Sequence, residues 1–340
     1  LTRKEGIGMI HLGIIGTNWI TDQFVQAAHE TGRYQLVAVY SRKLATAQSF
    51  AEKYGTVTCV DDLTAFFQLE ELDTVYIASP NSLHFEQAKQ GILAGKNVIV
   101  EKPAFSTPAE MAEIIELANQ KQVLFFEAAR NIHEKSFATI AAFLPEKGNV
   151  IGANFTYMKY SSRYDAVLAG EEPNIFSTHF SGGALADLGV YPVYAALAWF
   201  GRPQNVYYFA RKIVTGVDGI GTIILRYETF DVTIQTGKIG NSDLKSEIYF
   251  ENGTLELNAI NAIEQAVFYD RTHNETVLPV TAQANPMVEE AADFAAVIEN
   301  KTDPQLGARY EEWIELARNV NEAIYLMRKH AEITFDADKE

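Results

Sequence analysis

Residues 9–21 read MIHLGIIGTNWIT. A short apolar run leads through a glycine into an amphipathic stretch, which predicts a buried strand followed by a helix. Similar runs rich in Val, Ile and Leu recur at residues 35–40, 57–60, 74–78, 97–100 and 123–127. Amphipathic patterns separate these runs at residues 19–29, 45–54, 83–94 and 108–120. Strands that alternate with helices predict a parallel sheet with right-handed crossovers and helices on both faces.

The pattern changes after about residue 148. Later runs alternate apolar and polar residues, as strands do when one sheet face covers a core. They lie at residues 150–160, 206–214, 221–227, 230–237, 247–250, 254–258 and 266–269, and helical patterns lie at residues 135–143, 184–200, 286–299 and 310–331. We therefore predict an α/β domain over residues 9–130. An α+β domain with an open, mostly antiparallel sheet follows over residues 131–340, and its last helices pack back toward the first domain.

The composition argues against several classes of protein. The chain has 340 residues, a formal net charge of −16 and a single cysteine, Cys59. One cysteine permits no internal disulfide, and its place in an apolar run predicts a buried, unreactive thiol. A strongly acidic chain repels the phosphates of nucleic acids. No apolar run reaches the ~18–20 residues of a membrane span. We therefore expect neither a nucleic acid nor a membrane as a partner.

Location and assembly follow from related observations. The amino-terminal residues lack the apolar core of a signal peptide, so we expect a cytoplasmic protein. We expect the folded part to begin at Met9, with residues 1–8 as an upstream extension. An open sheet leaves one face exposed, and such a face predicts a homodimer or a higher homo-oligomer.

The first strand-to-helix turn is where a dinucleotide-binding fold places its phosphate loop. That loop prefers Gly-x-Gly-x-x-Gly, but residues 16–21 read GTNWIT and keep only Gly16. Asn18 replaces the second glycine; asparagine tolerates a left-handed backbone better than most residues. A helix amino terminus after the first strand still favours phosphate binding. We expect these residues to contact a cofactor: Gly16, Thr17, Asn18, Trp19 and Ile20. An ordinary strand-to-helix turn is the alternative.

The end of the second strand bears on the choice of cofactor. An NAD-specific fold places an acid there for the ribose 2′-hydroxyl, whereas this chain has Ser41 and Arg42. A hydroxyl and a guanidinium would bind a 2′-phosphate by charge-assisted hydrogen bonds. These residues predict that NADP(H) is preferred, with NAD(H) as the other candidate. The alternative is a solvated surface pair formed by Arg42 and Lys43.

Three further motifs lie beyond that strand. They are SPNSLH at residues 79–84, GKNVIVEKP at residues 95–103 and GGALADLGVYP at residues 182–192. In content, order and spacing they resemble the Gfo/Idh/MocA family of oxidoreductases, and the resemblance extends from Met9 to the end of the chain. It implies an amino-terminal Rossmann domain. It also implies transfer of a hydride between nicotinamide C4 and a small-molecule substrate that is a sugar, a polyol or a small carbonyl.

The resemblance assigns catalytic roles to Lys102, Asp187 and Tyr191. Lys102 would polarise the substrate oxygen, and Asp187 would position substrate hydroxyls or the lysine. Tyr191 would exchange a proton, since a phenol titrates near ~10 and a neighbouring ammonium favours its ionised form. If the segment is helical, Asp187 and Tyr191 share one face. The alternatives are a surface lysine, an acid in a cap or turn, and an aromatic core residue.

Further residues complete the expected site. The resemblance implies cofactor contacts from Ser79, Pro80, Asn81, His84, Glu101 and Lys102, although a structural histidine at position 84 is an equal alternative. The candidates for the substrate pocket beyond the catalytic three are His179 and, more weakly, Tyr157, Arg163 and Asn174. Arg130 and His133 follow the sixth strand, where residues 128–133 depart from the usual form of the family.

The chemistry of the site leaves other functions open. No histidine or carboxylate spacing matches a metal site, so we expect no metal. A non-catalytic NAD(P)-binding regulator is one rival interpretation, against which the set of Lys102, Asp187 and Tyr191 argues. Redox-assisted hydrolysis or epimerisation, with the cofactor retained and recycled, is another.

Overall fold

A computed structural model describes residues 8–339; the expectation for residues 1–7 lies outside that range. The first half of the chain forms a six-stranded parallel sheet in the order β3-β2-β1-β4-β5-β6. This is the predicted Rossmann arrangement, with strands buried on both faces. The strands are β1 (Ile10–Ile15), β2 (Tyr34–Tyr40), β3 (Thr58–Val60), β4 (Thr74–Ile77), β5 (Asn97–Glu101) and β6 (Phe125–Ala128).

Helices cover both faces of this sheet. They are α1 (Trp19–Glu30), α2 (Leu44–Ala51), α3 (Leu63–Phe67), the short η1 (Asn81–Leu83), α4 (His84–Leu93) and α5 (Pro108–Lys121). The predicted start of α5 is confirmed, because Thr107 caps it and exchanges hydrogen bonds with Glu110. Helix α3, which has only five residues, was not predicted from the sequence. The expectation of a buried thiol was wrong, because Cys59 on the edge strand β3 is only partly buried.

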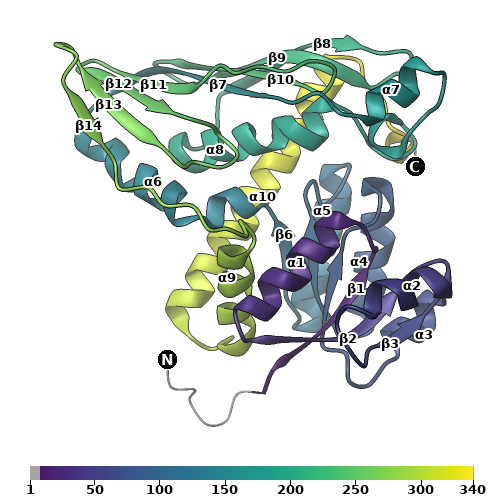
Figure 1. Cartoon of the computed structure of the whole chain (residues 1–340). Helices are drawn as coiled ribbons and strands as arrows, with labels where there is room; N and C mark the ends of the chain where they lie inside the picture. Colours follow the sequence, from purple (N-terminus) through teal and green to yellow (C-terminus); the bar gives the residue numbers. More distant parts are fainter. Residues whose placement is uncertain (1–7, 340) are drawn as a thin grey trace.

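The second half builds an eight-stranded sheet in the order β14-β13-β12-β11-β7-β10-β9-β8 (Figure 1). All its neighbours pair antiparallel except β7 and β10, so the expected mostly antiparallel sheet is confirmed. The strands are β7 (Val150–Met158), β8 (Asn205–Lys212), β9 (Asp218–Arg226), β10 (Asp231–Gly237), β11 (Ser246–Phe250), β12 (Gly253–Leu257), β13 (Ala266–Asp270) and β14 (Glu275–Val277). The sequence reading missed β14, whose three residues are all exposed.

One face of the second sheet is packed and the other is open. The helical segments of this half are η2 (Arg130–His133), α6 (Lys135–Lys147), α7 (Arg163–Leu168), η3 (Asn174–Phe176), η4 (Leu185–Gly189) and α8 (Val190–Phe200). Helices α6 and α8 lie under the sheet, on the side of the first domain (Figure 1). The core between α8 and the sheet includes Phe155, Ile223 and Ile234. No helix in the figure covers the upper face.

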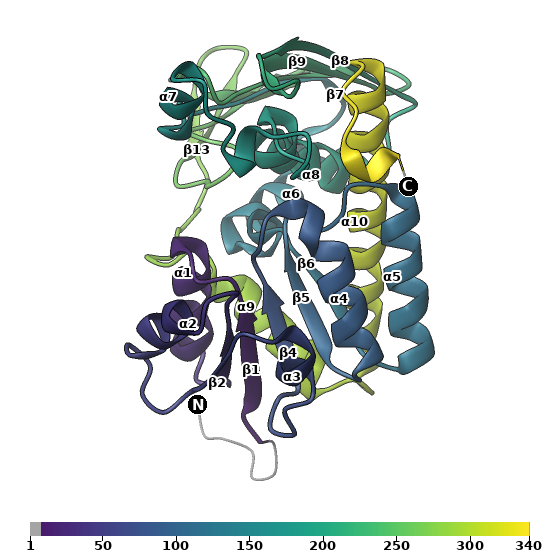
Figure 2. The same cartoon turned by 90° about the vertical axis from the view of Figure 1, so that its right-hand side faces the viewer.

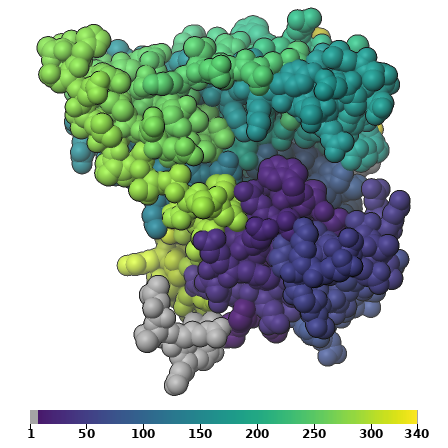
Figure 3. Space-filling view, in the orientation of Figure 1, coloured from purple at the N-terminus to yellow at the C-terminus, as the bar shows by residue number. Residues whose placement is uncertain are grey.

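The last two helices return to the first domain. Helix α9 (Val288–Glu299) packs against α1, and α10 (Pro304–His330) packs against α5, α8 and β8 (Figure 2). A short η5 (Asp336–Asp338) follows. Helix α10 begins six residues earlier than predicted, because Asp303 caps it and Pro304 opens its first turn. It therefore spans both halves, which rest against each other (Figure 3). Within residues 8–339, no helix is long and apolar enough to span a membrane.

Candidate active site

Lys102 lies where β5 ends, at the edge of the parallel sheet that faces the second domain (Figure 2). The peptide bond to Pro103 is cis. The turn is held from below by His84, whose ring nitrogens lie 3.2 Å from the carbonyl oxygens of Pro103 and Ala104 and 2.8 Å from that of Ser79. His84 is 1% exposed, and burial lowers its pKa. These contacts agree with a structural role for His84, because its ring fixes the turn that presents Lys102.

Asp187 meets Lys102 from the second domain. The Lys102 Nζ donates to the Asp187 carbonyl oxygen at 2.9 Å and to its Oδ1 at 3.3 Å. The other carboxylate oxygen, Oδ2, pairs with Lys238. Burial raises the pKa of Asp187, but the two ammonium groups outweigh it and lower that pKa to about 2. Burial also lowers the pKa of Lys102, but Tyr191 and Asp187 outweigh it and raise that pKa. Both groups are therefore charged at neutral pH.

Tyr191 completes the cluster. Its ring centroid lies 4.7 Å from the Lys102 Nζ and 5.5 Å from the Arg130 Cζ, so two cations approach one aromatic ring. The ring of Tyr157 on β7 meets the Tyr191 ring edge-on, with 5.7 Å between the two ring centroids. The predicted continuous helix over residues 184–200 is wrong in detail. Asp187 lies in a π-helical turn, η4, and Tyr191 lies in the first turn of α8. Both nevertheless reach Lys102.

The first strand-to-helix turn is tight at Gly16 and capped at Asn18. Gly16 has φ +103°, and a Cβ there would lie 2.7 Å from the Ala78 carbonyl oxygen, so only glycine fits. Asn18 does not adopt a left-handed backbone: its φ is −85° and its ψ 179°. Instead it caps α1, because its Oδ1 accepts from the amides of Ile20 and Thr21. Trp19 is 74% exposed at the start of that helix.

The end of β2 presents positive charge. Arg42 is exposed, and no ion pair involves it within residues 8–339. Ser41 is partly exposed, and its amide donates to the Val60 carbonyl oxygen. The two residues precede the amino terminus of α2, an end of a helix that favours anions.

The Ser-Pro-Asn motif lies at the seam between the domains. Pro80 precedes η1, and the Ser79 hydroxyl donates to Gln87 at 2.7 Å. The side-chain amide of Asn81 donates to the Ser181 carbonyl oxygen of the second domain at 3.0 Å. Glu101 lies below the surface, where it accepts a 2.6 Å hydrogen bond from Tyr76, and burial raises its pKa. These contacts build the floor of the site.

Other candidates lie apart from the cluster. His179 has a 66% exposed side chain and pairs with Asp336 at 2.9 Å. Arg163 is exposed at the start of α7. Asn174 begins η3. His133 is buried and pairs with Asp293. No described hydrogen bond or ion pair joins any of these four to the catalytic candidates.

Sequence reasoning missed Lys238 and underestimated Arg130. Lys238 directly follows β10 and lies 51 positions from Asp187, in no motif that would single it out. Arg130 lies in η2 with a 14% exposed side chain and pairs with Glu134 at 2.6 Å. An arginine after the last strand of a parallel sheet was the available signal, since ligands bind beyond those strand ends.

Buried acids surround the base of the site. Burial raises the pKa of Glu127 to about 7, although Tyr194 and the Ala104 amide donate hydrogen bonds to it. Burial likewise raises the pKa of Glu134 to about 7, against the effect of Arg130. Glu290 of α9 is fully buried, and neither carboxylate oxygen has a hydrogen-bond partner among the described residues. Burial raises its pKa well above its usual range.

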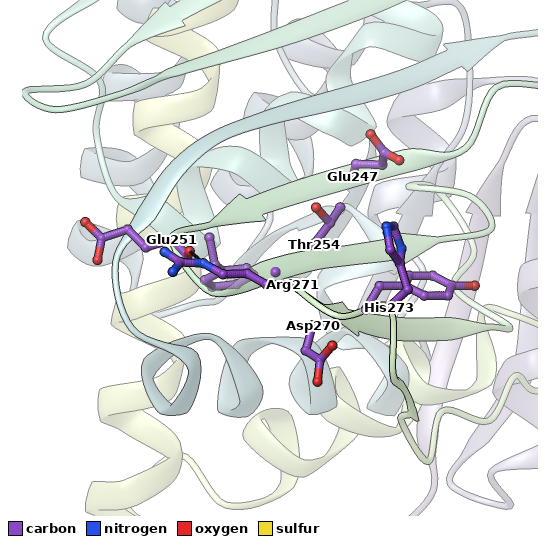
Figure 4. A pocket seen from close by; sticks show the side chains of 9 residues that line it. Glu247, Glu251, Thr254, Asp270, Arg271 and His273 are labelled. Carbon is purple, nitrogen blue, oxygen red and sulfur yellow. Dashed lines mark hydrogen bonds between the residues drawn. The ribbon is translucent and has the colours of Figure 1, made fainter.

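A separate hollow of about 500 Å³ lies over the hairpins of the second sheet (Figure 4). Its lining residues are Glu247, Phe250, Glu251, Gly253, Thr254, Tyr269, Asp270, Arg271 and His273. None of the catalytic candidates lines it. Among residues 8–339, no group of three or more His, Cys, Asp and Glu side chains is placed to hold a metal ion.

The fold and the motifs together define the class of protein. Residues 10–129 match the profile of the oxidoreductase family with an NAD-binding Rossmann fold, and residues 147–256 match the GFO/IDH/MocA carboxy-terminal domain. The chain belongs to this family of oxidoreductases, as its motifs predicted. Its first domain is an NAD(P)-binding Rossmann domain.

Particular relatives cover nearly the whole chain. It is 37% identical over 330 residues to the uncharacterized oxidoreductase YgjR of Escherichia coli, covering 97% of this chain and 99% of the relative. It is 36% identical over 332 residues to scyllo-inositol 2-dehydrogenase (NADP(+)) IolU of Bacillus subtilis, covering 97% and 100%. The 3-ketoreductase KijD10 of Actinomadura kijaniata, solved with NADP and TDP-benzene, shares the fold with a TM-score of 0.81, 21% identity and coverage of 95% and 98%.

Proposed function

We propose that this protein is an NADP(H)-dependent dehydrogenase or reductase that acts on a sugar, a polyol or a small carbonyl compound. The observation that supports this proposal best is the convergence of Lys102, Asp187 and Tyr191 at the carboxyl edge of the parallel sheet. Active sites of open α/β sheets lie at that edge. The regulator hypothesis gives no reason for such a charged, buried cluster.

The residues present fit an NADP cofactor. Gly16 lets the backbone turn tightly against Ala78, and the capped amino terminus of α1, an end of a helix that favours phosphate, follows this turn. The exposed Arg42 and the hydroxyl of Ser41 would bind a ribose 2′-phosphate. A nicotinamide cofactor, when bound, supplies the group that accepts or donates a hydride at C4.

The side chains of this site would handle the proton and the charge. Tyr191 would give a proton to the substrate oxygen during reduction and take one during oxidation. Lys102 would donate an N–H to that oxygen and stabilise the negative charge that develops on it. Asp187, ionised at neutral pH, would orient Lys102 and accept hydrogen bonds from substrate hydroxyls. Arg130 and Tyr157 would hold the Tyr191 ring in place.

The substrate class follows from the relatives and from the polarity of the site. IolU carries the name of a scyllo-inositol 2-dehydrogenase that uses NADP(+). A site that combines ammonium donors with a carboxylate acceptor suits a substrate with neighbouring hydroxyl groups. A polyol is therefore the first substrate to test.

The open face of the second sheet supports a further proposal, that the protein is a homodimer. Phe209 of β8 is 59% exposed and Val277 of β14 is 72% exposed at opposite edges of that sheet. Ile224 pairs across strands with Tyr207 and Thr233, so these side chains share the uncovered face. A broad, uncovered face suits a second copy of the same face.

A paired measurement tests the catalytic proposal. We expect Lys102→Met and Tyr191→Phe to lower kcat by about 10²- to 10⁴-fold, while the Kd for NADPH, followed by its fluorescence, changes less than about threefold. The screen uses sugars, polyols and dicarbonyls and follows NADPH absorbance. Wild-type rates in both variants would refute the assigned roles. Tight NADPH binding without turnover of any compound would favour the regulator instead.

A further inference from the structure

Lys238 is a buried lysine that none of the motifs includes. The residue is 5% exposed, and its backbone is fixed because its amide donates to Gly219 and its carbonyl oxygen accepts from Ser161. Its Nζ lies 5.7 Å from the ring centroid of Phe176 and pairs with Asp187. Lysine is almost never buried to this degree unless a charge partner offsets the loss of water. That partner is Asp187, a member of the catalytic cluster.

The Asp187 carboxylate is shared between the two lysines. Its Oδ1 accepts from Lys102 of the first domain, and its Oδ2 accepts from Lys238 of the second. The phenol of Tyr157 also feels the charge of Asp187, and its ring contacts that of Tyr191. With one carboxylate between two ammonium groups, the cluster carries a net positive charge. That charge suits a substrate oxygen that becomes negative during the reaction.

The sharing also determines what Lys102 can still bind. An ammonium group has three N–H donors. Lys102 uses one on the Asp187 carbonyl oxygen and one, at 3.3 Å, on Oδ1. Without Lys238, both carboxylate oxygens would be available to Lys102, and the third N–H would be drawn to Oδ2. With Lys238 in place, that N–H has no partner among the described residues and remains available to a substrate.

We propose that Lys238 is a positioning residue of the active site: it holds Oδ2 of Asp187 so that Lys102 keeps one N–H for the substrate oxygen. The inference rests on the proposed hydride-transfer function for its catalytic consequence. Its electrostatic consequence, that Lys238 together with Lys102 lowers the pKa of Asp187, holds without any substrate.

The kinetic test compares Lys238→Met with Lys238→Arg and with the control Lys89→Met. Lys89 of α4 pairs with Glu113 of α5 in the first domain. On the polyol that the wild type turns over, we expect Lys238→Met to lower kcat at least tenfold and to move the acid limb of the kcat/KM pH profile up by one unit or more. Lys238→Arg should restore the limb, and Lys89→Met should match the wild type. An unchanged limb in Lys238→Met would overturn the proposal.

A double-mutant cycle asks whether Lys238 acts through Asp187. In an Asp187→Asn background, Lys238→Met should change kcat less than twofold, because the group it positions is gone. A full tenfold loss in that background would contradict the proposal. If Lys238→Met does not fold, Lys238→Gln, which keeps a donor but lacks the charge, takes its place in every comparison.

A melting experiment needs no turnover and so separates this inference from the proposed function. Asp187 has a lowered pKa in the folded wild type and stabilises it above the pKa of the unfolded state. In Lys238→Met we expect the pKa of Asp187 in the folded protein to rise. The difference in Tm between this variant and the wild type should therefore be smaller at pH 4 than at pH 7. In the Asp187→Asn background, the difference in Tm between the proteins with and without Lys238→Met should not depend on pH. If the Tm difference decreased equally with falling pH in both backgrounds, Lys238 would not act through Asp187. This outcome does not depend on finding a substrate.

Discussion

At the scale of single residues, Arg42 determines the proposed preference for NADP(H). Its guanidinium is exposed and has no ion pair within residues 8–339, so a 2′-phosphate would gain a charge-assisted contact there. We expect Arg42→Ala to weaken NADPH binding about tenfold, consistent with the ~1.5–3 kcal/mol of a hydrogen bond to a charged group. NADH binding should change little. Thermal-shift titrations with both cofactors measure this.

The control for that comparison is Arg318→Ala, which removes an exposed arginine paired with Glu315 on α10. It should leave both titrations unchanged. A larger wild-type shift with NADH than with NADPH would overturn the role of Arg42.

Glu127 gives a prediction for the dependence of stability on pH. Its folded pKa of about 7 lies above the ~4.3 of an unfolded glutamate. Its contribution to stability is therefore complete below about pH 4 and is lost as the pH rises through 7. The loss from this one group is at most ~3–4 kcal/mol. We expect Glu127→Gln to flatten the fall in Tm between pH 5 and pH 8. A fall as steep as that of the wild type would contradict the raised pKa.

At the scale of elements, the cap of α1 combines stability with binding. Asn18 accepts hydrogen bonds from two amides of the first turn and donates to the Ala78 carbonyl oxygen. Asn18→Ala should cost about 1 kcal/mol of unfolding free energy and should also weaken NADPH binding. Asp303→Ala, which removes the cap of α10 far from the cofactor turn, should cost a similar free energy. NADPH affinity equal to that of the wild type in Asn18→Ala would exclude this turn from the cofactor site.

The elements also show how far the sequence predicts the structure. The parallel strands and the place of Lys102 were predictable because apolar runs and motifs are local signals. The contact between Lys238 and Asp187 was not, since it depends on how β10 and η4 meet in three dimensions. The π-helical turn before Tyr191 has no signature in the spacing of side chains. Helix α10 was predicted too short because its exposed first turns lack an apolar stripe, although Asp303 and Pro304 signal its start.

At the scale of the whole molecule, the uncovered sheet face predicts self-association. We expect sedimentation to show a homodimer and Ile224→Arg to yield a monomer, because it places an unpaired charge within the proposed interface. The control is Leu93→Arg, which changes an exposed leucine at the end of α4 on the first domain. It should remain dimeric. A wild-type monomer at micromolar concentration, or a dimeric Ile224→Arg, would refute this interface.

The packing of the two domains brings Lys102 of the Rossmann domain close to Asp187 and Tyr191 of the second domain. We attribute hydride transfer to the site that these three residues form. The most direct test incubates the wild-type protein and NADP⁺ with polyols and sugars deuterated at their carbinol carbons, and then analyses the cofactor by mass spectrometry. We predict that deuterium appears in the reduced nicotinamide with at least one of these compounds and is lost in Tyr191→Phe. Tight binding of the cofactor with no deuterium from any compound would contradict the account.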